Sequence, residues 1–257
     1  MKDYQFEVCA NSVESCIAAQ AGGADRVELC AGIPEGGTTP SYGDILIARE
    51  ALQQTKLHII VRPRGGDFLY SSTEQRIMLK DIENARRLGA DGVVFGCLTA
   101  EGDVDIPLME QLMEASQGMS VTFHRAFDVC RNPRKAIEDI IELGCNRILT
   151  SGQQPTAERG IPLLKELQQQ ASDRIILLAG CGVNETNIAH IARETGKAYN
   201  RSIKSLSPSP SPVGRGGEEA YKKRMYFSAH PFLYHRINII SSPEKSILHS
   251  DHPESHG

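Results

Sequence analysis

The sequence predicts an α/β protein that folds as a single (β/α)8 barrel with an atypical eighth strand. Three observations lead to this prediction: the length of the chain, a recurring helix–turn–strand unit, and the lack of a dinucleotide-binding glycine motif. The chain has 257 residues, of which 40% are hydrophobic, and this suits one barrel with a large core. In the recurring unit a glycine ends a helix and an apolar strand follows at once, as at Gly23, Gly89 and Gly144. Such alternation is typical of a parallel sheet.

Seven strand–helix units can be placed in the first part of the chain. The predicted strands cover residues 6–9, 27–30, 57–61, 92–95, 120–123, 147–150 and 175–179. The predicted helices cover residues 13–21, 42–53, 73–88, 106–115, 133–143, 157–169 and 185–194. Asn132 and Asn184 are the predicted N-caps of the fifth and seventh helices. Seven units without a dinucleotide motif favour a barrel over an open, doubly wound sheet.

The eighth unit departs from this pattern. A strand is expected after Gly196, but residues 197–202 have little strand character. Serine occupies every second position of residues 205–212, with leucine and then three prolines between, which excludes a helix and a central strand. Some strand character returns at residues 225–228 and 233–241. We therefore predict a barrel domain at residues 1–199 and an atypical, disordered tail at residues 200–257, and we expect the barrel to be imperfectly closed.

Composition limits the classes of partner and the compartment. A net charge of −4 and a pI near 6.1 indicate no excess of positive charge that would bind nucleic acid or an anionic membrane. No apolar run approaches the roughly 18–20 residues of a membrane-spanning helix, and the N-terminus lacks the apolar core of a signal peptide. The seven cysteines include no CxxC pair, which disfavours a structural zinc site. We expect a cytoplasmic protein whose thiols are reduced.

Polar side chains gather at the predicted carboxyl ends of the strands, where barrels of this class carry their chemistry. Because side chains alternate along a strand, Glu7 and Cys9 share one face, and Glu28 and Cys30 share the equivalent face of the next strand. If these faces point into the barrel, two thiolates meet at one mouth. Such a pair suits a soft ion, with Cu(I) the natural candidate. The alternative, which the residues alone favour, is two ordinary buried thiols.

Two arginines follow the third strand and a histidine follows the fifth. Arg62 and Arg64 are predicted either to face a small anion or to pair with Asp67 and another carboxylate in a structural clamp. His124 is a candidate general acid or base, with Glu7 or Glu28 sharing the proton transfer. Its neighbours Arg125 and Asp128 join the candidate anion-binding group, and Arg125 favours the neutral imidazole. The alternative is an ionic lattice that fills the barrel mouth.

A weaker signal lies after the seventh predicted strand. Residues 179–183 contain Gly180 and Gly182 and precede the predicted helix start at Asn184. This arrangement is similar to a phosphate cradle, in which backbone N–H groups hold the anion. Glycines also serve tight turns between strands and helices, so the signal is not specific.

Six segments together resemble the CutC copper homeostasis family, and they occur in that family's order within residues 4–196. The resemblance implies a TIM-like barrel, a cytoplasmic and often dimeric protein, and copper handling through Cu(I). It implies Cys9 and Cys30 as the metal ligands and a polar mouth at the barrel opening. The chain departs from the family pattern after Gly196. The segments are residues 6–9, 22–30, 35–41, 62–68, 122–128 and 149–152.

Three hypotheses follow for function. The first is a cytosolic Cu(I)-binding protein with Cys9 and Cys30 as ligands. The second is a barrel enzyme, an isomerase or lyase, in which Arg62 and Arg64 bind a small anionic or phosphorylated metabolite while His124 and Glu28 move protons. The third is an inactive, truncated paralogue, which the atypical C-terminal segment suggests.

Overall fold

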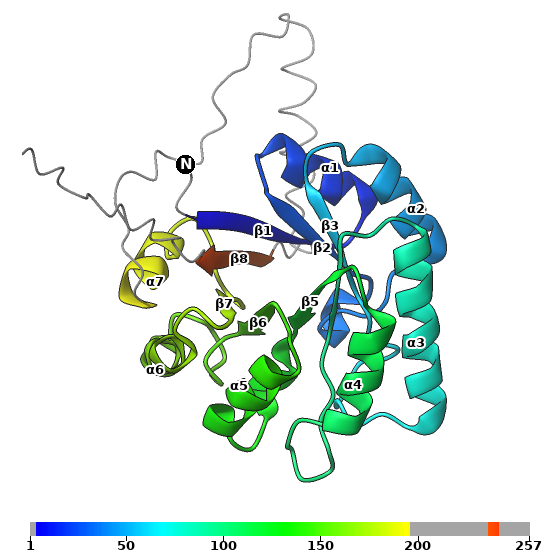
Figure 1. Ribbon diagram of the computed structural model, residues 1–257. Helices are drawn as coiled ribbons and strands as arrows, with labels where there is room; N and C mark the ends of the chain where they lie inside the picture. The colour runs from blue at the N-terminus through cyan, green and yellow to red at the C-terminus, as the bar shows by residue number, and fades with distance from the viewer. Residues whose placement is uncertain (1–3, 196–235, 242–257) are drawn as a thin grey trace, which may run out of the picture.

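The computed structural model describes residues 4–195 and 236–241. The strands are β1 (Tyr4–Ala10), β2 (Arg26–Leu29), β3 (Lys56–Ile60), β4 (Gly92–Phe95), β5 (Ser120–Phe123), β6 (Arg147–Thr150), β7 (Ile176–Ala179) and β8 (Arg236–Ser241). The helices are α1 (Val13–Ala21), α2 (Tyr42–Ala51), α3 (Ser72–Arg87), α4 (Ile106–Ala115), α5 (Pro133–Glu142), α6 (Ile161–Ala171) and α7 (Ile188–Thr195). Short 3-10 helices follow β2 at Ile33–Glu35 and β5 at Arg125–Val129. The predicted α/β barrel is confirmed, and Figure 1 shows the helices outside the strands.

Local sequence explains where the helices begin. Ser41 and Ser71 each accept a hydrogen bond from the backbone three residues later, and Asp44 and Glu74 complete two capping boxes. Asn132 caps α5 as predicted and accepts from two backbone N–H groups. The helix at residues 161–171 begins four residues later than predicted, and α7 begins at residue 188 rather than 185. Helix boundaries depend on turn packing that a sequence pattern does not resolve.

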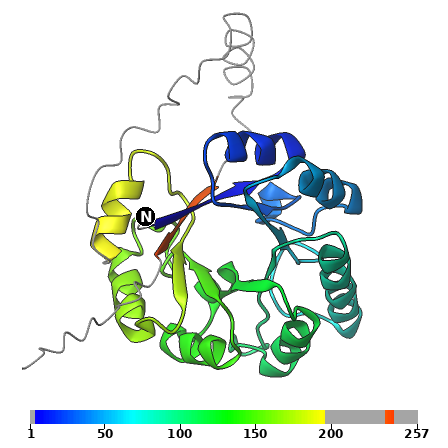
Figure 2. The ribbon, with the colours of Figure 1, turned by 45° about the horizontal axis from the view of Figure 1, so that its top comes forward.

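Seven parallel strands curl into the barrel, and β8 completes the ring. The eighth strand is atypical, as predicted: it comes from residues 236–241 and runs antiparallel to both β1 and β7. The ring is therefore hydrogen-bonded all round, where imperfect closure was expected. In Figure 2 the orange strand β8 lies between β1 and β7. Residues 197–202, where an eighth strand was expected but the sequence has little strand character, lie outside the described residues, as does the rest of the predicted disordered tail.

The main hydrophobic core lies between the strands and the helices. Val27, Leu29, Leu57 and Ile59 alternate along β2 and β3 and pack in one cluster with the buried faces of the helices. The residues between them point to the barrel interior, which is unusually polar. Glu7 and Arg26 form a buried ion pair there, and His58 is also buried. The mouth of this polar interior is where the candidate residues gather.

Candidate functional site at the barrel mouth

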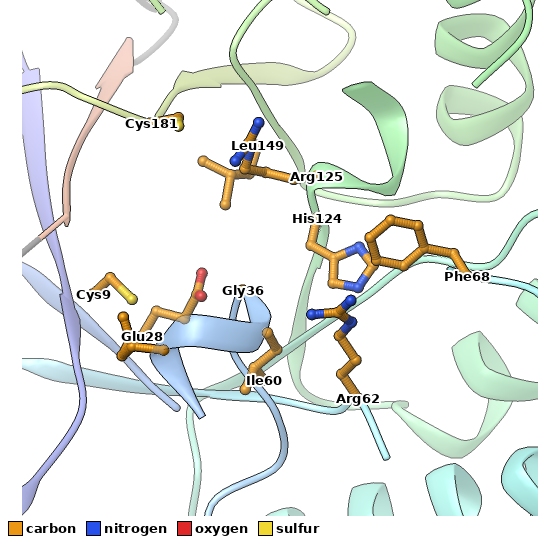
Figure 3. A pocket seen from close by; sticks show the side chains of 11 residues that line it. Cys9, Glu28, Gly36, Ile60, Arg62, Phe68, His124, Arg125, Leu149 and Cys181 are labelled. Atoms are coloured by element: carbon orange, nitrogen blue, oxygen red, sulfur yellow. The ribbon is translucent and has the colours of Figure 1, made fainter. Parts of the chain in front are cut away.

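A small pocket of about 40 Å³ opens at the carboxyl ends of the parallel strands. Of the predicted residues, Cys9, Glu28, Arg62, His124 and Arg125 line it, while Cys30, Arg64, Asp67 and Asp128 do not. Figure 3 shows Cys9 and Glu28 on one side and His124, Arg62 and Phe68 on the other. A buried water needs roughly 10–15 Å³ on this measure, so the pocket suits a few waters or a small ligand. The other lining residues are Ile33, Gly36, Ile60, Phe68, Leu149 and Cys181.

His124 is buried, with 4% of its surface exposed, and its tautomer follows from one contact. Its Nδ1 accepts a hydrogen bond from the backbone N–H of Ala126 at 3.3 Å, so the proton of the neutral ring sits on Nε2. Burial, together with the positive charges of Arg62 and Arg125, lowers the pKa of His124 to about 3. The imidazole is therefore neutral near pH 7, and its Nε2–H is a hydrogen-bond donor.

The guanidinium of Arg62 holds the loop that follows β2 in place through hydrogen bonds to its backbone. Its Nη1 donates to the carbonyl oxygens of Glu35 and Gly37, and its Nη2 donates to that of Gly66. The guanidinium carbon also lies 4.8 Å from the centre of the Phe68 ring. These three bonds leave one N–H on Nη2 and the N–H on Nε, and Nε has no hydrogen-bond partner among the described residues. Arg62 thus joins the two loops that frame the pocket.

Arg64 and Asp67 lie away from the pocket and bond to each other. Arg64 Nη2 donates to Asp67 Oδ1 at 2.9 Å, and Arg64 Nε donates to Glu74 Oε1 at 2.5 Å. The side chain of Asp67 is 72% exposed, so this pair faces solvent at the start of α3. The geometry is that of the structural clamp weighed for this segment, with Glu74 as the second carboxylate. Exposed pairs of this kind add little stability, typically about 0–1 kcal/mol.

Asp128 organises the loop after β6 rather than the pocket itself. It accepts from Arg125 Nε at 2.8 Å and from the Thr150 hydroxyl at 2.6 Å. It also accepts from the backbone N–H groups of Ser151 and Gln153. The structure therefore brings Arg125 and Asp128 together as an ion pair, and this pair fixes Arg125 at the pocket wall.

The two predicted thiols lie together at the mouth. The sulfur atoms of Cys9 and Cys30 are 3.4 Å apart, and both residues pack against Ile60. Cys9 faces the pocket, while Cys30 lies behind it under the loop that Arg62 clamps. Gly37 lies over the thiol with a φ of 99°, which favours glycine, and a Cβ there would lie 3.1 Å from Ile60 Cδ1. Among residues 4–195 and 236–241, no group of three or more His, Cys, Asp or Glu could hold a metal ion.

Phe68 is the functional residue that the sequence analysis missed. Its ring lies 4.9 Å from the His124 ring, edge to face, and also covers the Arg62 guanidinium. It therefore shields two buried donors, His124 Nε2 and Arg62 Nε, that have no partner in the part of the chain described. An unsatisfied buried donor costs about 1–3 kcal/mol. Phe68 ends the motif that contains both arginines, and that position was the only signal available.

The predicted phosphate cradle contributes one residue to the pocket wall. Cys181 has a positive φ of 77° and lies beside Gly182, which has a φ of 72°. The Cys181 thiol donates to the carbonyl oxygen of Pro155 at 3.2 Å. Since α7 begins only at residue 188, the turn is separated from the helix start. A phosphate site at residues 179–183 stays a prediction.

Comparison with known proteins gives the family. A CutC protein of Bacteroides thetaiotaomicron is 80% identical over 196 residues, which cover 76% of this chain and 79% of that protein. One of Parabacteroides distasonis is 59% identical over 202 residues, covering 78% and 83%. A crystal structure of CutC from Streptococcus agalactiae, named for a copper homeostasis role, has a TM-score of 0.71 and 37% identity. It covers 74% of this chain, and the match spans 93% of that chain.

More distant structures agree on the architecture alone. An aldolase, QR15, has a TM-score of 0.57 at 17% identity and covers 73% of this chain. The sequence profile described as the CutC family matches residues 4–205, so it includes β1 to α7 and every pocket residue but not β8. The predicted resemblance is confirmed: this chain belongs to the CutC family.

Proposed function

We propose that this chain is a cytoplasmic copper homeostasis protein that binds Cu(I) through Cys9 and Cys30 at the barrel mouth. The distance of 3.4 Å between the two sulfur atoms carries the proposal. Metal–thiolate bonds are about 2.3 Å long for zinc, and an ion of similar size can reach both sulfurs at once. Two thiolates are the soft ligands that Cu(I) prefers.

The surroundings of the pair support a buried site that an ion can reach through the pocket. Cys9 lines the pocket, so an ion has an approach to one sulfur without opening the core. Cys30 is almost fully buried and held under the loop of residues 33–37. None of the seven cysteines, all of which are described, forms a disulfide. No helix among the described residues is long and apolar enough to cross a membrane.

A competition titration tests this proposal. The reduced chain is titrated with Cu(I) in the presence of a chromogenic chelator, alongside the double variant Cys9→Ala, Cys30→Ala. We expect the variant to lose the tight site, because each thiolate supplies one of the two proposed bonds. The matched control is Cys145→Ala, since Cys145 is buried against Met113 away from the pocket. Equal Cu(I) affinity in the wild type and the double variant contradicts the proposal.

A second candidate function is an isomerase or lyase acting on a small anionic metabolite. A neutral histidine, two arginines and a carboxylate line one pocket at the catalytic end of the barrel, and this observation favours it. A screen of small anions for a rise in melting temperature tests this candidate. No rise with any anion at high concentration contradicts it.

A further inference from the structure

Two hydrogen-bond donors beside the pocket are buried under one aromatic ring. His124 and Arg62 are each 4% exposed, and both line the pocket. Among the described residues, neither His124 Nε2 nor Arg62 Nε has a hydrogen-bond partner. Most buried polar groups in proteins are paired, so two neighbouring exceptions at a pocket point to a ligand that completes them. Figure 3 shows both side chains together with Phe68 on the same wall.

We propose that His124 Nε2 and Arg62 Nε form a binding site for a small carboxylate, which the Phe68 ring covers and uncovers by rotating. This site rests on the second candidate function, which uses the same pocket. It adds the chemical class of the ligand and the two donors that bind it. Carboxylate oxygens accept N–H donors, and a hydrogen bond between an N–H group and a charged acceptor is among the stronger ones.

The mobile part of this site is the Phe68 side chain. Its backbone is fixed, because the carbonyl oxygen of Phe68 accepts from the N–H of Leu98 at 2.9 Å. The ring contacts His124 and Arg62 but is only half-buried, so a rotation about its side-chain bonds exposes both donors. Such rotations are fast and need no loop opening.

The size of the pocket and the nearby carboxyl group favour a small monoanion. Arg62 supplies one formal positive charge, Arg125 is paired with Asp128, and the carboxyl group of Glu28 lies on the opposite wall. A phosphate dianion brings two negative charges towards that wall, whereas a carboxylate brings one. The pocket volume of about 40 Å³ also favours a ligand of a few heavy atoms. We therefore expect acetate to bind more tightly than inorganic phosphate.

Binding of acetate, measured by ligand-detected NMR on the full chain, tests the site. We expect His124→Ala to weaken acetate binding by about tenfold, the effect of losing one hydrogen bond to an anion. His124→Gln, which restores an N–H donor near the Nε2 position, should recover part of this affinity. Arg64→Gln is the matched control, because Arg64 lies outside the pocket, and it should bind like the wild type. Equal acetate affinity in the wild type and His124→Ala overturns the proposal, as does tighter binding of phosphate.

Two further measurements keep the test independent of folding and of catalysis. Phe68→Ala removes the cover and should tighten acetate binding several-fold; weaker binding overturns the proposed role of the ring. In wild-type protein labelled with nitrogen-15 at histidine, Nε2 should carry the proton of His124 and Nδ1 should be bare. The opposite tautomer overturns the assignment of the donor. A chain that binds acetate but turns over no metabolite contradicts the enzyme candidate and leaves this site standing.

The pH dependence separates a neutral donor from a charged one. The charged groups around the imidazole are Arg62 and Arg125, with Glu28 on the opposite wall, and its other neighbours are Phe68 and Phe123. Because the pKa of His124 is about 3, acetate affinity should stay level from about pH 6 to about pH 8. Affinity that falls as pH rises through about 6.5 indicates a protonated imidazole and overturns the proposal.

Discussion

The sulfur atoms of Cys9 and Cys30 lie 3.4 Å apart even though the sheet register pairs Cys9 with Glu28. Cys30 comes two residues after Glu28 and just beyond the end of β2. Its thiol also lies 3.5 Å from the carbonyl oxygen of Ala10. The backbone N–H of Cys30 donates to the carbonyl oxygen of Ala10 at 2.9 Å, so the chain still runs beside β1 at this point. The result is a pair of thiols from adjacent strands at a separation that allows shared chemistry.

This separation predicts a disulfide under oxidation. A disulfide bond is about 2.05 Å long, so a small movement of either side chain joins the two sulfurs. We expect a mild thiol oxidant to cross-link Cys9 to Cys30 before any other pair, and peptide mass spectrometry can identify the linked fragments. The oxidised chain should also lose tight Cu(I) binding, because the disulfide leaves neither Cys9 nor Cys30 as a thiolate. Cross-linking of Cys16 or Cys97 in preference to this pair contradicts the prediction.

Removing the charge of Asp128 should destabilise the barrel mouth. Asp128→Asn replaces a carboxylate that accepts from Arg125, Thr150 and two backbone N–H groups. We expect a loss of about 2–3 kcal/mol in the free energy of unfolding, because charge-assisted bonds to a buried group are strong. Urea unfolding measures it. Glu83→Gln, which removes an exposed pair with Lys80, is the control and should change stability by less than about 0.5 kcal/mol.

The buried neutral histidine makes the fold sensitive to acid. The pKa of His124 is about 3 in the folded chain against an ordinary value of 6.5, so below about pH 6.5 the unfolded chain binds a proton that the folded chain refuses. Stability therefore falls as pH drops from about 6.5 towards 3, by at most about 1.4 kcal/mol per pH unit from this residue.

The variant His124→Gln isolates this contribution. Urea unfolding at a series of pH values should show a shallower loss of stability on acidification than in the wild type. Some acid sensitivity should remain, because burial and the charges of Arg26 and Arg147 also lower the pKa of His58. Parallel pH profiles for the two proteins contradict the prediction.

Gly96, which directly follows β4, leaves the space that the His124 ring occupies. A Cβ added to Gly96 would lie 2.8 Å from His124 Nδ1 and 3.0 Å from the Phe123 ring. Gly96→Ala should therefore destabilise the chain by about 1–3 kcal/mol and weaken acetate binding, because the imidazole must move. Gly43→Ala is the control: its Cβ would meet only Ser41 Oγ at 3.8 Å, and it lies within α2. That change should be neutral or stabilising. Equal stability of the two variants contradicts the prediction.

The sequence by itself determined the fold and the charged and polar side chains of the pocket wall. The repeated strand–helix units place Cys9, Glu28, Arg62 and His124 at the same ends of β1, β2, β3 and β5, and alternation directs Cys9 and Glu28 inward. These features are local and periodic, so they can be recognised in the sequence without knowledge of long-range contacts. The departure of the C-terminal segment was visible for the same reason, since proline at alternate positions excludes a regular eighth unit.

Only the tertiary structure decided which polar groups face each other. Arg62 and Arg64 belong to one motif after β3, but their side chains point in different directions. Arg62 therefore binds the carbonyl oxygen of Glu35, whereas Arg64 pairs with Glu74. The cover of the His124 ring by Phe68 depends on a contact between the segments that follow β3 and β5. The antiparallel closure by residues 236–241 likewise depends on pairing with β1, more than 220 positions earlier in the chain. Such pairings leave no periodic trace, because they are set by packing between segments that are distant in sequence.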